Sequence, residues 1–314
     1  MVIGKISHIF NRPFEHFEKV DFFRKVLYLF LLLNALLLLP IAQDLFGYHG
    51  LVGTRGWNTN LPLYRQGTHG LINILSHPGN GSYSWFYLVF VIGQITFLIS
   101  GLLNFWPKIS SFFVYFFTVN LFLKGYLAFT GGEVLINFLL FYLMFIHKRK
   151  EEGTFGDLQN ILNNTFYWIL LIQICILYFF SAFYKLYDPN WTSGEAIMYI
   201  SRIDNYSSAP FEWLFGERLW LSMIATYLTL AYQLLFPLLV WIKKVKTPFL
   251  MVGVVFHLGI AFGMGIFSFG IVMIIVYLLF LDLKQIRRIK DFLKQSKLKG
   301  LFKPFYSQKL NIED

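Results

Sequence analysis

Two ionisable residues in long apolar stretches, Lys185 and His257, are the strongest candidates for chemistry in this sequence. An ionisable group inside a membrane span costs about 2.5–3.5 kcal/mol on insertion scales, so its presence needs a reason. Desolvation of Lys185 favours the neutral amine, which can accept a proton. The alternative is a side chain that extends to the interface and pairs with Asp188. His257 is expected to be neutral and to exchange one hydrogen bond with a hydroxyl or carbonyl group, or else to be an ordinary packing residue.

The remaining ionisable groups indicate structure rather than catalysis. Lys124 and Glu133 flank one predicted turn, where an ion pair between them is expected. His49, His69 and His77 share a loop, but they lack the close spacing typical of metal ligands. The sequence contains no nucleophile elbow, phosphate loop or paired-carboxylate motif. We therefore expect no metal site and no hydrolase chemistry.

The composition is that of a membrane protein. Hydrophobic residues make up 56% of the 314 residues and charged residues only 14%, whereas a soluble domain has about a quarter charged residues. The 37 phenylalanines suit lipid-facing surfaces and interfacial belts. The single cysteine, Cys175, excludes an internal disulfide. A soluble domain is therefore excluded, and a bacterial inner-membrane location is expected.

Eight apolar runs are candidates for transmembrane helices, because about twenty residues cross the hydrocarbon core as a helix. Two glycine-containing segments, Gly131-Gly132 and Gly263-Met264-Gly265, predict tight turns between the third and fourth runs and between the seventh and eighth. The sequence thus predicts an all-α polytopic bundle with about eight transmembrane helices. The runs lie near residues 24–43, 83–104, 108–129, 132–147, 165–186, 219–242, 247–264 and 267–284.

The placement of positive charge predicts the orientation. With both termini in the cytoplasm, most of the 27 Lys and Arg residues lie on the cytoplasmic side. The net charge of +10 then reports topology and attraction to anionic membrane lipids, and no nucleic acid partner is expected. Residues 1–23 and 285–314 are predicted to be amphipathic cytoplasmic segments around a transmembrane domain, 24–284. The outer loops 44–82 and 187–217 are long and irregular, as loops that cap or line a site often are.

Two segments carry a family resemblance. The first is Lys185-Leu-Tyr-Asp-Pro-Asn-Trp191, followed by Gly194, and the second is His257-Leu followed by Phe267-Ser268-Phe-Gly270. In order, separation and membrane placement they resemble the membrane domain of the vitamin K-dependent γ-carboxylase. That domain belongs to the horizontally transferred transmembrane (HTTM) family. The resemblance covers roughly residues 20–284.

The resemblance implies a chemistry. In the carboxylases a lysine deprotonates a reduced naphthoquinone, of the menaquinol or vitamin K hydroquinone type. Oxygenation of that anion gives a strong base that prepares glutamate for carboxylation. By resemblance Lys185 is the base and His257 lines the quinol site. The resemblance also places six further residues at the substrate site: Asp188, Trp191, Gly194, Phe267, Ser268 and Gly270.

The sequence departs from the family pattern at three places. Lys185 is separated from Trp191 by one residue more than in the carboxylases, and Glu133 and Asn137 occur where those enzymes have a histidine. Only a short basic tail follows residue 284, in place of a large outer β-rich domain. Carboxylation of protein glutamates is therefore not expected.

Three hypotheses follow from the sequence. The first is an enzyme or binder that acts on a quinol-like isoprenoid at the outer leaflet, as a quinol-dependent oxygenase would; it predicts an apolar cavity that reaches Lys185 and His257. The second is a non-catalytic membrane partner, an assembly or anchoring factor for other envelope proteins, which predicts co-purification with another protein. The third is a transporter, which needs a path linking both faces of the membrane. The substrate, the partner and the oligomeric state stay open.

Overall fold

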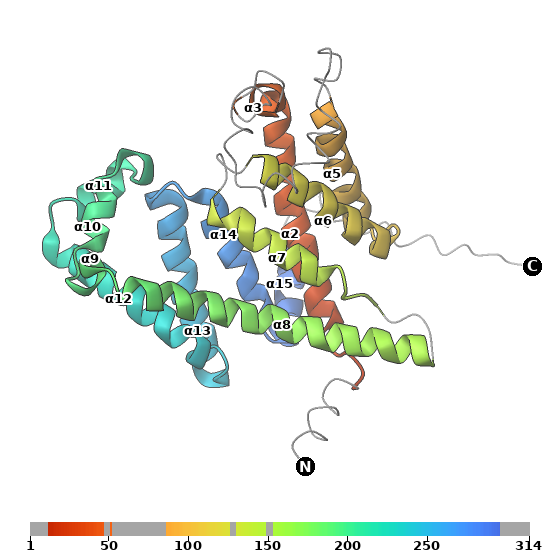
Figure 1. Ribbon diagram of the computed structural model, residues 1–314. Coiled ribbons are helices and arrows are strands. Elements are labelled where there is room, and N and C mark those ends of the chain that lie inside the picture. The colour runs from red at the N-terminus through yellow and green to blue at the C-terminus, as the bar shows by residue number, and fades with distance from the viewer. Residues whose placement is uncertain (1–11, 47–50, 52–85, 126–129, 149–152, 296–314) are drawn as a thin grey trace, which may run out of the picture.

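The predicted all-α fold is confirmed by the computed structural model, which describes residues 12–46, 51, 86–125, 130–148 and 153–295. Within these ranges every regular element is a helix. The apolar helices pack side by side, and α8 crosses the front of the bundle in Figure 1.

Each of the eight predicted runs contains a helix. The second, third, fourth and eighth runs correspond to shorter apolar helices, whereas four helical segments are long and apolar enough to cross a membrane: Phe17–Phe46, Thr154–Lys185, Leu219–Leu239 and Lys243–Gly263. Their length and composition are compatible with a multi-pass integral membrane protein. The elements of the bundle are α2 (Phe17–Leu38), η1 (Leu39–Ile41), α3 (Ala42–Phe46), α5 (Phe86–Leu102), α6 (Pro107–Lys124), α7 (Gly131–Leu143), α8 (Thr154–Lys185), α12 (Leu219–Leu239), α13 (Lys243–Leu258), the π-helical turn η4 (Gly259–Gly263), α14 (Phe267–Val276), η5 (Tyr277–Leu279) and α15 (Leu283–Gln295).

Two of these helices begin earlier than predicted. The first run was predicted to start near residue 24, but α2 starts at Phe17. The fifth was predicted to start near residue 165, but α8 starts at Thr154 and includes part of the predicted inner loop. The apolar runs used for the prediction end where polar residues begin. In the structure these polar side chains are buried and hydrogen-bonded, as are Lys19 and Arg24 in α2 and Asn163 in α8.

Buried cations join the start of α2 to other helices. Lys19 Nζ donates a hydrogen bond of 2.5 Å to the Tyr167 hydroxyl on α8. Arg24 donates to the carbonyl oxygens of Leu143, at 3.0 Å, and Ile146. The last carbonyl groups of a helix lack intrahelical partners, so Arg24 satisfies acceptors at the end of α7. These hydrogen bonds stabilise the charged start of α2, which explains why the helix begins before the apolar run.

The segment 187–217 was predicted to be an irregular outer loop, but it is not irregular. It folds into four short helices, α9 (Pro189–Thr192), α10 (Ala196–Ser201), η3 (Asp204–Tyr206) and α11 (Ala209–Phe215). Figure 1 shows α9, α10 and α11 together at one end of the molecule, beyond the end of α8. Short helices satisfy backbone groups locally, which favours them in a segment without a sheet to join. Most of the other predicted loop, 44–82, including its three histidines, lies outside the described residues.

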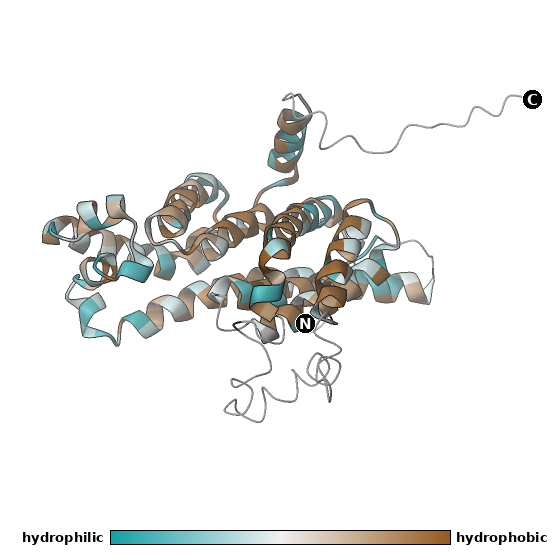
Figure 2. Cartoon of the chain, turned by 90° about the horizontal axis from the view of Figure 1, so that it is seen from above, coloured by the Kyte–Doolittle hydropathy of each residue, from teal (hydrophilic) through white to brown (hydrophobic). Residues whose placement is uncertain are grey.

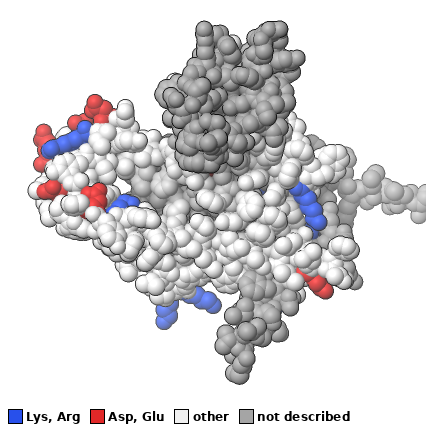
Figure 3. Space-filling model, viewed as in Figure 1, with Lys and Arg blue, Asp and Glu red and all other residues white. Residues whose placement is uncertain are grey.

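Apolar residues dominate the centre of the bundle. The largest buried cluster draws on α2, α7, α8, α12, α13 and α14. Figure 2 shows hydrophobic colouring along much of the helical bundle, and Figure 3 shows a broad uncharged face with Lys, Arg, Asp and Glu gathered at its margins. Large hydrophobic side chains such as Leu37, Val255 and Leu238 are more than half exposed, as expected for surfaces that face lipid.

Helix α15 is basic and amphipathic, and it docks on α2. Ile286 is fully buried. Arg287 and Lys290 form ion pairs with Glu18, at 2.9 and 3.1 Å. Phe292 is 71% exposed, so it does not share the buried face of Ile286. The start of the predicted tail therefore packs on the bundle, while residues 296–314 lie outside the described part.

An ion pair between Lys246 and Asp282 links α13 to the segment before α15, with Nζ 2.8 Å from Oδ1. Asp282 lies beyond the end of η5, outside the candidate spans. The hydrogen bond from Lys246 holds the pKa of Asp282 below its ordinary value of 3.8. A carboxyl group with a lowered folded-state pKa stabilises the protein above its unfolded pKa, and this stabilisation is lost as the pH falls through the folded pKa.

We therefore expect the melting temperature in detergent to fall below about pH 3.8, and this part of the fall to be absent in Asp282→Asn. Because Asp282 is exposed, the variant is expected to lose about 1 kcal/mol or less at neutral pH. Thermal unfolding followed across the acid range checks this. Identical pH profiles for the two proteins would show that the pair does not contribute.

Candidate functional site

Lys185 is held at the end of α8 and has no carboxylate partner among the described residues. Its Nζ donates to the Ser181 carbonyl oxygen at 3.2 Å and lies 2.8 Å from the Ser181 hydroxyl. It also lies 5.0 Å from the centroid of the Trp191 ring. Asp188 instead accepts a hydrogen bond from the Asn190 amide at 2.9 Å and caps α9. The Lys185–Asp188 ion pair considered from sequence is therefore not formed.

His257 lies in the core, where it ends a chain of tyrosine hydroxyl groups. Its ring is 1% exposed. Nε2 is 2.7 Å from the Tyr178 hydroxyl, which is 2.7 Å from the Tyr277 hydroxyl. Tyr277 is in turn 2.8 Å from the Tyr232 hydroxyl. The four residues come from α8, α12, α13 and η5, so the network ties together three of the four helical segments that are long and apolar enough to cross a membrane.

The network is tightly enclosed. The Tyr178 ring stacks on Phe236 with centroids 3.8 Å apart. Gly253, one turn before His257, leaves room for two hydroxyl groups: a Cβ at this position would lie 1.9 Å from the Tyr232 oxygen and 2.3 Å from the Tyr277 oxygen. A glycine is therefore required here for the tyrosines to meet. Hydroxyl groups both donate and accept, so this chain can reverse its hydrogen bonds without moving heavy atoms.

One atom of the network has no hydrogen bond. His257 Nδ1 is buried and has no partner among the described residues. Buried polar atoms are nearly always satisfied, so an unsatisfied one suggests a place for a further hydrogen-bonding group. The Tyr178 hydroxyl can donate to Nε2 or accept from it, so Nδ1 is left free to donate or to accept respectively.

Lys185 and His257 are not in contact, but His257 contacts Tyr178, which shares one face of α8 with Lys185. Tyr178, Ala182 and Lys185 lie on the same face of α8, which packs against α12. Lys185 is seven residues beyond Tyr178, which corresponds to two helical turns, or about 10 Å along the axis. In the described part of the chain no hydrogen bond or ring contact joins the amine to the imidazole. His257, which contacts Tyr178, therefore lies about two turns of α8 before Lys185 along this face.

The residues predicted around Lys185 have distinct roles. Trp191 contacts the amine, and Asp188 caps α9. Gly194 adopts a φ of +86°, and a Cβ there would lie 3.0 Å from the Tyr227 ring on α12. This glycine is needed for both the turn and the close packing. Of Asp188, Trp191 and Gly194, only Trp191 contacts the Lys185 amine.

The residues predicted around His257 lie on α14, and Gly270 among them lies close to His257. A Cβ on Gly270 would lie 2.5 Å from the His257 carbonyl oxygen, so α14 approaches α13 closely at this point. Phe269, which was not predicted, lies 5.9 Å from the His257 ring. Phe267 is 47% exposed and packs on Phe262 instead.

Ser268 has a structural partner, Glu133. It donates to Glu133 Oε1, while Oε2 accepts from the Thr130 amide at 2.6 Å and from the Thr130 hydroxyl at 2.9 Å. This arrangement is a capping box that also joins the start of α7 to the start of α14. The Lys124 side chain, the predicted partner of Glu133, lies outside the described residues.

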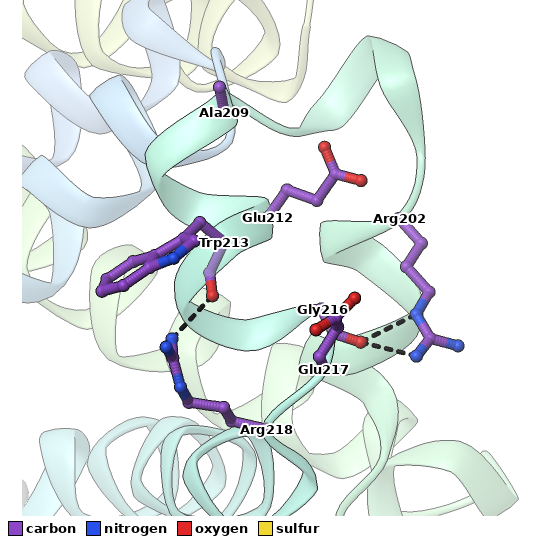
Figure 4. Close-up of a pocket in the computed structure, with 7 residues that line it drawn as sticks. All are labelled: Arg202, Ala209, Glu212, Trp213, Gly216, Glu217 and Arg218. Atoms are coloured by element: carbon purple, nitrogen blue, oxygen red, sulfur yellow. Dashed lines mark hydrogen bonds between the residues drawn. The ribbon is translucent and has the colours of Figure 1, made fainter.

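A separate polar pocket of about 660 Å³ lies between α10, α11 and the start of α12 (Figure 4). Arg202 donates to the Gly216 carbonyl oxygen at 2.9 and 2.6 Å. Arg218 donates to the Trp213 carbonyl oxygen at 2.7 Å and covers the Trp213 ring. Glu212 also lines it. Neither Lys185 nor His257 does, so this is not the apolar cavity that the sequence predicts.

Comparison of the chain with protein-family models, characterised proteins and solved structures finds no match. The candidate site is therefore identified from the geometry of the chain itself. Among the described residues, no three His, Cys, Asp or Glu side chains gather closely enough to hold a metal ion. The unusual groups are the unpaired lysine amine and the buried imidazole with its tyrosine chain.

Proposed function

We propose that this chain is a multi-pass inner-membrane protein of the HTTM type that binds a reduced naphthoquinone and removes a proton from it. Lys185 is the base, and His257 binds a polar group of the ligand. The observation that carries the proposal is the Lys185 amine, which has no carboxylate partner in the described part of the chain and lies on the face of α8 that leads to the buried Tyr178–His257 network.

The contacts between helix ends support eight crossings with both termini in the cytoplasm. In that topology α2, α8 and α13 start on the cytoplasmic side and α7 ends there. Arg24 near the start of α2 meets the end of α7, and Lys19 meets Tyr167 in the cytoplasmic half of α8. At the opposite end, the starts of α7 and α14 meet through Glu133 and Ser268. Lys185, at the far end of α8, belongs to the outer side.

Each group has a defined task in this proposal. The neutral amine of Lys185 takes the proton of a quinol hydroxyl group, which leaves a quinolate anion beside the new ammonium ion. Ser181 and the Trp191 ring hold the amine and favour the ammonium form after transfer. His257 Nδ1, free of partners among the described residues, exchanges a hydrogen bond with a second polar group of the ligand. The surrounding apolar helices exclude water from the anion.

Trp191 offers a direct test of binding. An oxidised naphthoquinone is stable and quenches nearby tryptophan fluorescence, so titration of the purified protein should give saturable quenching. In Trp191→Phe most of that quenching should disappear. Trp220→Phe is the matched control, because Trp220 is 64% exposed on α12 and has no contact with Lys185.

Quenching that is not saturable, or that survives in Trp191→Phe but not in Trp220→Phe, would contradict the proposed site. Stoichiometric co-purification of another protein, together with an absence of quinone binding, would instead support the alternative of an assembly or anchoring factor.

A further inference from the structure

A second site lies at the other end of α8, where two unpaired lysines meet an apolar surface. The pocket has a volume of about 490 Å³ and includes Lys108, from the start of α6, and Lys148, which follows α7. Both side chains are exposed, and within the described residues no hydrogen bond or ion pair holds either ammonium group. The described residues that line this pocket include no carboxylate. Among its described lining residues, the pocket therefore carries two positive charges and no negative one.

The floor of the same pocket is apolar. Phe155, Leu158 and Leu162 line it from one face of α8. Phe155 is 75% exposed and Leu158 is 51% exposed. A row of exposed apolar side chains that leads away from two cations matches an amphiphile with an anionic headgroup. A free inorganic anion would not contact these apolar side chains.

An adjoining pocket of about 270 Å³ shares Lys148 and contains an unsatisfied imidazole. His147 lines it and is 5% exposed. Nε2 lies 2.8 Å from the Met144 carbonyl oxygen, and a carbonyl oxygen only accepts, so Nε2 carries the proton. In the neutral ring Nδ1 is then an acceptor, and it has no donor in the described part of the chain. A ligand hydroxyl group would satisfy it.

We propose that the two adjoining pockets bind one anionic glycerophospholipid whose headgroup carries a hydroxyl beyond its phosphate. The phosphate lies between Lys108 and Lys148, a headgroup hydroxyl donates to His147 Nδ1, and an acyl chain follows Phe155 and Leu158. Charge-assisted hydrogen bonds from the two ammonium groups to the phosphate supply the preference for an anionic lipid. This site is independent of the quinol proposal, because it shares no residue with it.

Native mass spectrometry of the full chain in detergent, titrated with single lipids, tests the site. Phosphatidylglycerol should bind about tenfold more tightly than phosphatidylcholine, and more tightly than phosphatidic acid, which lacks the headgroup hydroxyl. In Lys108→Gln/Lys148→Gln the preference over phosphatidylcholine should disappear. In Lys243→Gln/Lys244→Gln, which removes two exposed lysines at the start of α13, the preference should persist.

The outcomes separate the parts of the proposal. Equal binding of phosphatidylglycerol and phosphatidylcholine, or an unchanged preference in Lys108→Gln/Lys148→Gln, would overturn it. Equal binding of phosphatidylglycerol and phosphatidic acid would remove the role of His147. Displacement of the lipid by millimolar inorganic phosphate would show a simple anion site instead. Because both lysines are exposed, the melting temperature of Lys108→Gln/Lys148→Gln should match wild type, so a loss of binding is not a loss of fold.

Discussion

Lys185→Ala is expected to lower by about 10²- to 10⁴-fold the rate at which dioxygen oxidises a reduced naphthoquinone bound to the protein, because a positioned general base usually contributes that much to the deprotonation that precedes oxidation. The amine has no carboxylate to neutralise it among the described residues, and its contacts are Ser181 and Trp191. The rate is measured from the absorbance of the quinone product. Melting temperature should change little, because Lys185 is only half-buried and its contacts are local.

Lys185→Arg separates two roles for the lysine. Arginine keeps the positive charge, but it cannot accept a proton at any ordinary pH. If Lys185 is the base, the arginine variant is as slow as the alanine variant. Activity near wild type in Lys185→Arg would show that the residue acts only through its charge, and the proton acceptor would have to be sought elsewhere.

Gly253→Ala is expected to destabilise the protein by about 3 kcal/mol, at the upper end of ordinary overpacking effects. The new methyl group would lie 1.9 Å from the Tyr232 hydroxyl and 2.3 Å from the Tyr277 hydroxyl, and both are locked in the buried network. The network must open, which leaves buried hydroxyl groups without partners. Thermal unfolding in detergent measures the effect.

Gly259→Ala is the matched control for Gly253→Ala. Gly259 lies in the same helical run, and a Cβ there would meet nothing within 4 Å. Its melting temperature should therefore equal or exceed that of wild type. Tyr232→Phe removes one of the two clashing oxygen atoms, so combining it with Gly253→Ala should cost less than the sum of the single changes. Strict additivity would mean that the tyrosine hydroxyl is not the obstacle.

Hydropathy predicted where helices form better than where they begin. Each apolar run contains a helix, because burying backbone polar groups in an apolar segment favours helix regardless of detail. The start of α2 was missed because Lys19 and Arg24 are charged in the sequence but hydrogen-bonded in the fold. The start of α8 was missed because polar residues there, such as Gln159 and Asn163, are hydrogen-bonded to the segment that follows α7. The helices within 187–217 were missed because their short, mixed composition lacks a periodic pattern.

The candidate site was partly predictable for a related reason. Lys185 and Trp191 are close in sequence, and their contact follows from one helix end and one turn. Tyr178 and His257, by contrast, are 79 residues apart, and Tyr178 and Tyr277 are 99 apart. Nothing distinguishes these tyrosines from the other members of a set of 18 until the helices are packed. The importance of Gly253 could not be predicted either, because it depends on side chains from two other elements.

Photolabelling with an azide-bearing naphthoquinone, followed by peptide mapping, tests the central claim most directly. We expect label on α8 between Tyr178 and Lys185, on Trp191, and on α13 around His257. Excess unlabelled naphthoquinone should abolish it. Label spread over the lipid-facing helices and indifferent to the competitor, or confined to the pocket of Figure 4, would contradict a quinol site on this face of α8.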